Sequence, residues 1–332
     1  YWSLSPRIWT RFAVRLGKEA ARRLGAKIVI ASYLGREISA QEADIVARAC
    51  DASPSAITLA EYSSMAPALK KLKSDTIHAC LMHDLLSDRA ERFRDGGQVI
   101  DFDETSLETE LGWLSGCDLI FFISANELAK VQRRLPDIQM AWAAPDAPDY
   151  QTTENAGAPR AVFIGTVHGG NADALNHFLD DVWPQVRARA PTLDFWIAGS
   201  IGKTLTPPRA ALPGVKVLGR VDSLESIGGA NAIGIAPTRF ATGTSIKVAE
   251  YLLLGMPAVV YPLALEGFGD ALDDLVVTAS GPEALAAEIL SLAGDSARRS
   301  ALSDGARKHA RGRLSHDEAI AAIHRMLAER RA

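Results

Sequence analysis

Cysteine is scarce in this sequence: its 332 residues contain three, Cys50, Cys80 and Cys117. They lie far apart and form no C-x-x-C pair, which argues against a disulfide framework and a zinc cluster of the usual spacing. Sparse, unpaired cysteines are typical of a reducing compartment. We therefore expect a cytoplasmic protein.

Long hydrophobic runs and a surplus of positive charge are also missing. The longest apolar stretch, residues 252–265, is broken by a glycine and two prolines and is too short to span a bilayer. The sequence opens without a short basic region leading into an apolar run, so we expect no signal peptide. Because the formal net charge is -4, no global basic surface can neutralise phosphates, and we expect no nucleic-acid partner.

Positive charge gathers instead in residues 7–27. This segment holds seven arginines and lysines against the single acid Glu19, with aromatic and leucine side chains between them at helical spacing. An amphipathic helix of this kind can lie on an anionic membrane surface, which predicts a peripheral membrane protein. The alternative is an ordinary helix whose basic face lies in water, and the sequence leaves both open.

The chain is long enough for two hydrophobic cores, with 48% apolar and 23% charged residues. Short apolar runs alternate with helix-period segments along its length. The runs are residues 27–32, 56–59, 76–81, 118–124 and 138–143 in the first half, and 161–165, 193–199, 215–219, 232–236, 257–261 and 275–278 in the second. Such strands form parallel sheets with helices on both faces, so we predict an α/β fold with doubly wound sheets.

Helix starts are marked by local chemistry. Ser39 with Glu42 and Thr105 with Glu108 have the spacing of a capping box, in which a hydroxyl and a carboxylate satisfy free backbone N–H groups. We expect one helix to begin directly after Ser39 and another directly after Thr105.

The domain organisation follows from a break in the pattern at residues 145–159, which are rich in proline and polar residues. We expect a first domain over 1–150, a second over 156–295, and final helices over 296–332 that pack back towards the first. The first clear strand begins only at Lys27 and no glycine-rich loop follows it. We therefore expect that an opening strand precedes residue 1 or that the first domain is reduced.

Three strand ends in the second half carry glycine. Gly165-Thr166 ends one strand, and Gly199-Ser200 and Gly219-Arg220-Val221 end the next two. In an open parallel sheet, ligands bind outside the carboxyl ends of the strands, where glycine lets the backbone approach a phosphate closely. Each loop alone is also typical of an ordinary turn.

A longer polar loop, residues 237–245, follows the strand at 232–236 and leads into a helix. The free N–H groups and positive dipole end of such a helix suit a diphosphate. Lys247 and Glu250 project from one side of this helix, where Lys247 could reach phosphate and Glu250 could accept hydrogen bonds from a ribose. An intrahelical ion pair between these two side chains, with no ligand, explains their spacing equally well.

The same run resembles the donor-site signature of GT-B glycosyltransferases of family four, the glycosyl transferases group 1. The pattern reads roughly P-x-R-F-G-x-G-x-x-x-K-x-x-E-A-x-x-x-G-x-P-V-V. The matching positions are Pro237, Arg239, Phe240, Gly243, Lys247, Glu250, Gly255, Pro257 and Val259, with Val260 directly after them. The likeness extends over most of the second half. It implies a GT-B fold, in which two Rossmann-like domains face each other across a cleft.

For the second half, the resemblance implies a site for a nucleotide-diphosphate sugar. Gly165 and Thr166 would lie beside the diphosphate, while Lys247 would neutralise it and Glu250 would hold the ribose. The other donor-binding candidates are Arg220 and Val221 beside the base, Arg239 and Gly243 in the loop, and Thr244 and Ser245 as donors to phosphate. The loop departs from the family pattern at Ala241 and at Thr242, which stands where many relatives carry a carboxylate for the donor sugar.

The first half offers a catalytic candidate in His83-Asp84, at the end of the strand at 76–81. A histidine at a strand end is more often structural when judged on its position alone. The resemblance implies that His83 contacts the donor sugar, with Asp84 and Arg89 in support. Glu61, after the strand at 56–59, either faces the same cleft or caps a turn.

These residues predict a glycosyltransferase that moves a sugar from a UDP- or GDP-sugar to a glycan or lipid-linked acceptor. A helix start and Lys247 can stabilise the leaving diphosphate, so we expect neither a metal nor a cofactor. Asp101 and Asp103 are interpreted as part of a solvated acidic stretch. The resemblance favours retaining transfer in a bacterial surface polysaccharide or glycolipid pathway.

Other functions remain open on the sequence. Ala241 and Thr242 motivate a nucleotide-sugar-binding pseudoenzyme that acts as a partner subunit without transfer activity. A sugar-nucleotide epimerase and a two-lobed small-molecule receptor would share the architecture, because fold and function are separable.

Overall fold

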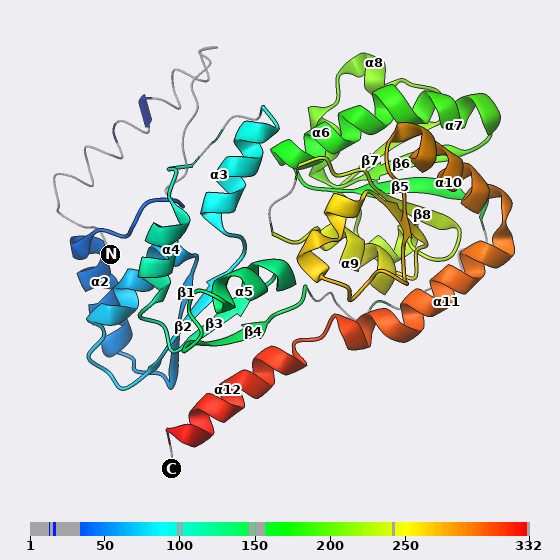
Figure 1. The fold of residues 1–332 in the computed structure, drawn as a ribbon. Helices are drawn as coiled ribbons and strands as arrows, with labels where there is room; N and C mark the ends of the chain where they lie inside the picture. The colour runs from blue at the N-terminus through cyan, green and yellow to red at the C-terminus, as the bar shows by residue number, and fades with distance from the viewer. Residues whose placement is uncertain are drawn as a thin grey trace.

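The computed structural model describes residues 34–97, 100, 102–145, 150, 157–240 and 243–330, together with residues 13, 16 and 17. The chain forms two α/β domains (Figure 1). The charged residues of segment 7–27, the predicted strand at 27–32, and Asp101, Ala241 and Thr242 lie outside the described residues.

The first domain contains a four-stranded parallel sheet in the order β1-β2-β3-β4. Its strands are β1 (Ile57–Glu61), β2 (Ile77–Met82), β3 (Leu119–Phe122) and β4 (Gln139–Trp142). Its helices are α2 (Ala40–Asp51), η1 (Ser63–Lys71), α3 (Leu86–Asp95), α4 (Leu107–Leu114) and α5 (Ala125–Gln132). All four residues of β3 are buried, as expected for a strand covered on both faces.

The two faces of this sheet are covered by segments from opposite ends of the chain. Ile120 and Phe122 pack with η1, α4 and α5 on one face, whereas Leu119 and Phe121 pack with α12 (Asp317–Glu329) on the other. This alternation follows from the period of two along a strand. The last helix therefore completes the core of the first domain.

The second domain contains a six-stranded parallel sheet in the order β10-β9-β8-β5-β6-β7. Its strands are β5 (Arg160–Ile164), β6 (Asp194–Ala198), β7 (Val215–Gly219), β8 (Ala232–Ala236), β9 (Ala258–Val260) and β10 (Val277–Thr278). The strand order reverses between β5 and β8, so this sheet is doubly wound in the Rossmann order.

Helices cover both faces of the second sheet. One face packs against α6 (Gly169–His177), η2 (Phe178–Val182), α7 (Trp183–Arg189) and α10 (Pro282–Gly294). The other packs against α9 (Ile246–Leu253) and α11 (Ser296–Arg313). The connections contain η3 (Ser200–Thr204), α8 (Pro207–Ala210), η4 (Leu224–Ile227), η5 (Pro262–Ala264) and η6 (Glu266–Phe268).

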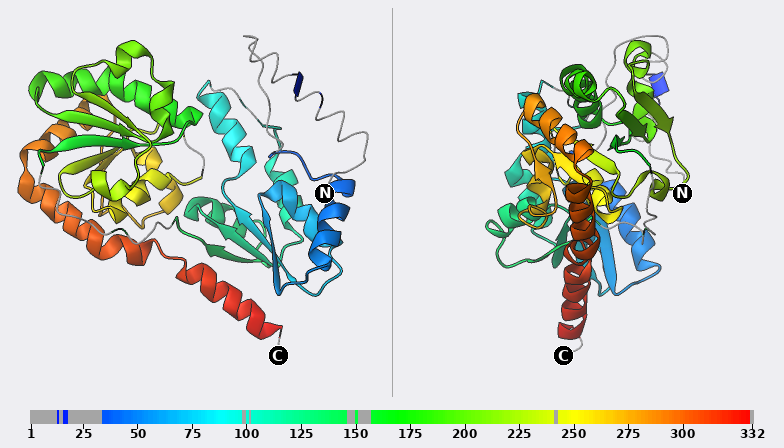
Figure 2. Two further views of the ribbon diagram at one scale, coloured as in Figure 1. Left: turned by 180° about the vertical axis from the view of Figure 1, so that it is seen from behind. Right: turned by 90° about the vertical axis from the view of Figure 1, so that its right-hand side faces the viewer.

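The chain returns to the first domain through α11 and α12. Figure 2 shows α11 running along the second domain and α12 continuing towards the first. Arg330, just after α12, donates to Asp75 at 2.8 Å and to Asp118 at 3.2 Å in the first domain. Among the described residues, no helix combines the length and the apolar character that crossing a membrane requires.

The predicted strands and one predicted helix cap are confirmed. Every predicted strand outside 27–32 is present, and Ser39 forms a complete capping box with Glu42. The predicted cap at Thr105 was wrong by one residue, because Ser106 accepts the N–H of Thr109 at 3.2 Å and α4 begins at Leu107. Two adjacent hydroxyl side chains can both serve as caps, and the sequence does not choose between them.

Candidate functional site

The site lies where the strand order of the second sheet reverses. β5 and β8 are neighbours, and the connections that leave them run to opposite faces, which is the place where ligands bind in sheets of this kind. Gly165 and Thr166 follow β5 and precede α6, while the loop at 237–245 follows β8 and precedes α9. The N-terminal ends of two helices therefore meet at this edge, and each is a potential anion site.

Lys247 connects these two helix starts. Its Nζ donates to Asn171 Oδ1 at 2.6 Å, and the Asn171 amide nitrogen donates to the backbone oxygen of Thr166 at 3.0 Å. The ammonium also lies 5.3 Å from the ring centre of Phe163. Burial lowers the pKa of Lys247 to about 8, although the nearby Glu250 carboxyl opposes the shift. A cation held here would gain from an anionic ligand.

Glu250 lies one turn further along α9, half-buried on the same helix. Burial raises the pKa of its carboxyl, and the ammonium of Lys247 opposes that rise. The intrahelical ion pair considered from the sequence would direct Lys247 at Glu250. The structure instead directs the Lys247 ammonium at Asn171 on the neighbouring helix.

The hydroxyl groups of the loop divide into two kinds. Thr244 Oγ1 donates to the backbone oxygen of Ile123 in the first domain at 2.6 Å, so this hydroxyl is engaged in a domain contact. By contrast, Thr238 Oγ1 and Ser245 Oγ are buried and have no hydrogen-bond partner among the described residues. Unsatisfied buried hydroxyls are costly, so they favour a polar ligand at the loop.

The glycine residues at the ends of β5, β6 and β7 lie together. Gly199 donates its N–H to Gly219 at 2.6 Å, and a Cβ on Gly199 would lie 2.2 Å from the backbone oxygen of Gly165. Only glycine fits such an approach at its positive φ of 94°. Arg220 and Val221 follow β7, and Val221 packs against the hydrophobic cluster that contains Val248 and Ala249 of α9, so their predicted place beside the base stays a prediction.

Arg239 is already paired within the second domain. Its guanidinium donates two hydrogen bonds to Asp173 on α6, at 3.0 and 2.5 Å, and these bonds raise its pKa. Bidentate pairs of this kind fix the position of both side chains. The predicted role of Arg239 in donor binding stays a prediction, because its charge is matched before any ligand is present.

The predicted catalytic pair meets the loop before α9 across the domain boundary. His83 and Asp84 follow β2, and Gly243 of the loop packs directly against them. A Cβ on Gly243 would lie 2.6 Å from the His83 backbone oxygen and 3.3 Å from the Asp84 Cβ. Gly243 thus brings the loop before α9 into contact with the first-domain candidates.

His83 is flanked by two side chains from the end of β1. The ring of Tyr62 lies 4.9 Å from the imidazole, and Glu61 Oε2 lies 3.9 Å from Nε2. Tyr62 has φ 66° and ψ 149°, a region that is essentially restricted to glycine and costs energy for any other residue. Glu61 was a candidate from the sequence, whereas Tyr62 was missed, since no sequence pattern signals such a backbone.

Asp84 and Arg89 form a buried pair beside His83. Their charged atoms are 3.5 Å apart, and the Arg89 guanidinium lies 5.2 Å from the ring of Phe93 and 5.0 Å from that of Phe102. Arg89 therefore holds Asp84 and packs on two rings in the first domain. This contact supports a positioning role more directly than contact with a substrate.

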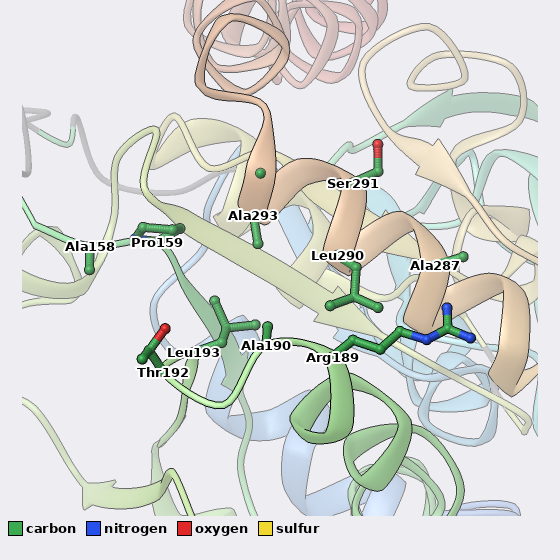
Figure 3. Close-up of a pocket in the computed structure, with 11 residues that line it drawn as sticks. Ala158, Pro159, Arg189, Ala190, Thr192, Leu193, Ala287, Leu290, Ser291 and Ala293 are labelled. Carbon is green, nitrogen blue, oxygen red and sulfur yellow. The ribbon is translucent and has the colours of Figure 1, made fainter.

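A separate cavity of about 700 Å³ lies at the opposite end of the second sheet (Figure 3). It lies between Ala190 at the end of α7, Leu193 before β6 and Leu290 on α10, with Pro159 before β5 at its rim. Pro159 precedes β5, and Ala190 and Leu193 precede β6, whereas the loops with Gly165 and Lys247 follow their strands. The cavity is therefore not part of the candidate site.

Comparison with known proteins identifies the second domain. Residues 158–295 match the family model described as glycosyl transferases group 1. That segment is a glycosyl transferases group 1 domain. No curated protein matches the sequence.

Solved structures show that the group 1 domain is part of a GT-B fold. A mutant of TarM from S. aureus, solved with Fondaparinux, alpha-GlcNAc-glycerol and UDP, has a TM-score of 0.64 at 10% identity over 86% of this chain and 58% of that chain. Sucrose-phosphate synthase from Thermosynechococcus elongatus has a TM-score of 0.66 at 14% identity over 89% of this chain and 80% of that chain. WaaG, a glycosyltransferase involved in lipopolysaccharide biosynthesis, has a TM-score of 0.51 at 13% identity over 74% of this chain and 73% of that chain. The chain thus spans little more than half the length of TarM.

Proposed function

We propose that this chain is a glycosyltransferase that moves a sugar from a nucleotide-diphosphate sugar to a glycan or lipid-linked acceptor. One observation carries the proposal: Lys247 joins the starts of α6 and α9 at the edge of the second sheet where the strand order reverses. The same loop packs against His83 and Asp84 of the first domain. A donor bound there would hold its sugar between the two domains.

The charges suit departure of a nucleoside diphosphate. Cleavage of the sugar–phosphate bond develops negative charge on the diphosphate, which two helix starts and the Lys247 ammonium would stabilise. Glu250 would accept hydrogen bonds from the ribose, and His83 would contact the donor sugar. We propose that this positive charge makes the transfer independent of a metal, and that it proceeds with retention.

Two features of the similar structures support narrower proposals. The TarM structure holds UDP, which favours a UDP-sugar over a GDP-sugar as the donor. WaaG acts in lipopolysaccharide biosynthesis, which favours a bacterial surface glycan or glycolipid as the product. Cytoplasmic localisation and membrane attachment through residues 7–27 remain proposals, which salt-sensitive sedimentation with anionic liposomes would test.

A partner subunit that binds the donor without transferring its sugar is the second candidate. Thr242 replaces the carboxylate that many relatives direct at the donor sugar, and Arg239 is paired with Asp173. Both features leave the diphosphate contacts intact and reduce the contacts available to the sugar.

The test is nucleotide release from a panel of UDP- and GDP-sugars, measured with and without glycan acceptors. We expect nucleotide release from the sugars of one nucleotide only. The rate of this release should fall by about 100-fold or more in Lys247→Ala and in His83→Ala. Lys308→Ala, an exposed lysine on α11, is the matched control and should retain full activity. Donor binding without release would favour the partner subunit, and the absence of both would refute the proposal.

A further inference from the structure

Glu127 is a buried acid at the boundary between the two domains. It lies in the first turn of α5, is 8% exposed, and donates its N–H to the cap Ser124 at 3.3 Å. From sequence it is simply an acidic residue of a helix start. Buried carboxyl groups need partners, so its contacts define its role.

Each carboxyl oxygen of Glu127 accepts a hydrogen bond from a different domain. Oε2 accepts the N–H of Leu85 at 3.1 Å, and Leu85 directly follows His83 and Asp84. Oε1 accepts the N–H of Gly243 at 3.3 Å, and Gly243 belongs to the loop before α9. One side chain thus binds the backbone of both halves of the candidate site.

The surrounding contacts place Gly243 and Thr244 against the first domain. A Cβ on Gly243 would lie 2.6 Å from the His83 backbone oxygen, so the backbone at Gly243 lies close to the first domain. The neighbouring Thr244 is tied to the backbone oxygen of Ile123 at 2.6 Å, which opposes movement away from the first domain. Glu127 supplies the second such tie, at the residue that touches His83.

We propose that Glu127 is a positioning residue for the transfer reaction, which holds the donor loop of the second domain at a fixed distance from His83 and Asp84. The proposal rests on the proposed function, because positioning has meaning only for a donor bound at this loop. That Glu127 holds the loop through Gly243 can be tested separately, without a donor. Misplacement of reacting groups by about 1 Å can cost about 100-fold in rate, so a residue outside the chemistry can control it.

Glu127→Gln separates this role from a general contribution to folding. Above about pH 8 Glu127 is ionised and each of its oxygens accepts one N–H group, whereas a glutamine of the same size has one acceptor oxygen and cannot accept both. One of the two domain ties is lost while the packing is kept. Glu108→Gln is the matched control, because Glu108 is an exposed acid of the same domain.

The decisive experiment combines hydrogen exchange with steady-state kinetics, both at a pH above about 8, where Glu127 is ionised. We expect Glu127→Gln to speed exchange in a peptide covering residues 243–253 by about 10-fold, and to lower kcat for nucleotide release by about 10-fold or more. UDP affinity should change by less than about threefold, since Lys247 and the helix starts are untouched. Glu108→Gln should change none of these.

Other outcomes would overturn the proposal. Unchanged exchange and unchanged kcat in Glu127→Gln would show that the residue does not hold the loop, and a loss of UDP binding as large as in Lys247→Ala would show a direct role in donor binding. Thr244→Val removes the other tie, the hydrogen bond from Thr244 to the backbone oxygen of Ile123, and should reproduce the faster exchange even if Glu127→Gln folds poorly. If the wild-type chain releases no nucleotide, the proposed function fails, whereas the exchange result still decides whether Glu127 ties the loop.

Discussion

The Lys247 ammonium lies 2.6 Å from the side-chain oxygen of Asn171, so the first turn of α9 is tied to the first turn of α6. Both helix starts are thereby fixed at the boundary between β5 and β8 before a donor arrives. Positive groups that are already in place need little reorganisation when charge develops on a leaving group. We therefore expect nucleotide binding to depend on Lys247.

The pH dependence of UDP binding should report the charge of Lys247. Burial lowers the pKa of this side chain to about 8, so its ammonium is present below that pH and is lost above it. A nucleoside diphosphate is already fully ionised there. We therefore expect UDP affinity to fall between about pH 8 and pH 10, as measured by calorimetric titration. Lys247→Arg keeps its charge and should bind with little pH dependence, and equal slopes for both proteins would contradict this assignment.

Gly243→Ala should destabilise the protein more than an equivalent change elsewhere. Its φ is 65°, and the new Cβ would lie 2.6 Å from the His83 backbone oxygen. Gly97→Ala is the matched control, because its φ is 64° and nothing lies within 4 Å of the added Cβ. Both variants carry the cost of a left-handed alanine, so the difference isolates the domain contact. We expect Gly243→Ala to cost roughly 1–3 kcal/mol more in thermal unfolding, and an equal cost would mean that the domains do not meet at this residue.

A comparison of two substitutions at Tyr62 should reveal stored backbone strain. Alanine removes the ring and keeps the strain, whereas glycine removes both. Glycine in an ordinary position is less stable than alanine by roughly 0.5–1 kcal/mol. Because Tyr62 has φ 66°, we expect Tyr62→Gly to be more stable than Tyr62→Ala by roughly 1–3 kcal/mol in urea unfolding. Both variants should lose nucleotide-release activity, since the ring beside His83 is gone. If Tyr62→Ala is instead more stable than Tyr62→Gly, the backbone at this position is not strained.

Glu127 should make stability depend on pH. Burial, reinforced by Asp84 and Asp88, raises the pKa of its carboxyl to about 8 from 4.5. These two acids pair in turn with Arg89 and Lys130. Between these two pKa values the folded state therefore binds a proton that the unfolded state releases. The contribution of this proton to the free energy of unfolding is full below about pH 4.5 and is lost as the pH rises to about 8.

The matched measurement for this titration is the Tm of the wild type and of Glu127→Gln from about pH 5 to pH 9. The wild type should lose Tm relative to the variant as pH rises, until the difference levels off above about pH 8. The underlying free energy is on the order of a few kcal/mol, because each unit of pKa shift corresponds to about 1.4 kcal/mol. A difference in Tm that does not change with pH would show that Glu127 does not titrate in this range.

Much of the second domain could be predicted from sequence because its signals are local. Apolar runs marked the strands, and the chain order placed Gly165 and the loop before Lys247 at strand ends on one edge of the sheet. The spacing of Lys247 and Glu250 placed them on one helix, but it could not decide between an ion pair and a ligand site. That decision required Asn171, which lies 76 positions away in the chain.

The domain boundary could not be predicted in the same way. Glu127 carried only the signal of a helix start, and its bond to Gly243 joins residues 116 positions apart. Tyr62 carried no signal, because an unfavourable φ is imposed by the surrounding fold and has no preferred residue type. Such features depend on how two complete domains meet, which no local pattern encodes.

The most direct test of the account is calorimetric titration of UDP into the wild type, Lys247→Ala and Lys308→Ala. The account predicts saturable binding to the wild type and to Lys308→Ala, with affinity reduced by about 10-fold or more in Lys247→Ala, since a charge-assisted bond to phosphate contributes about 1.5–3 kcal/mol. Equal affinity in all three proteins would place the nucleotide away from the start of α9. Absence of binding to the wild type would contradict a nucleotide-sugar site in this chain.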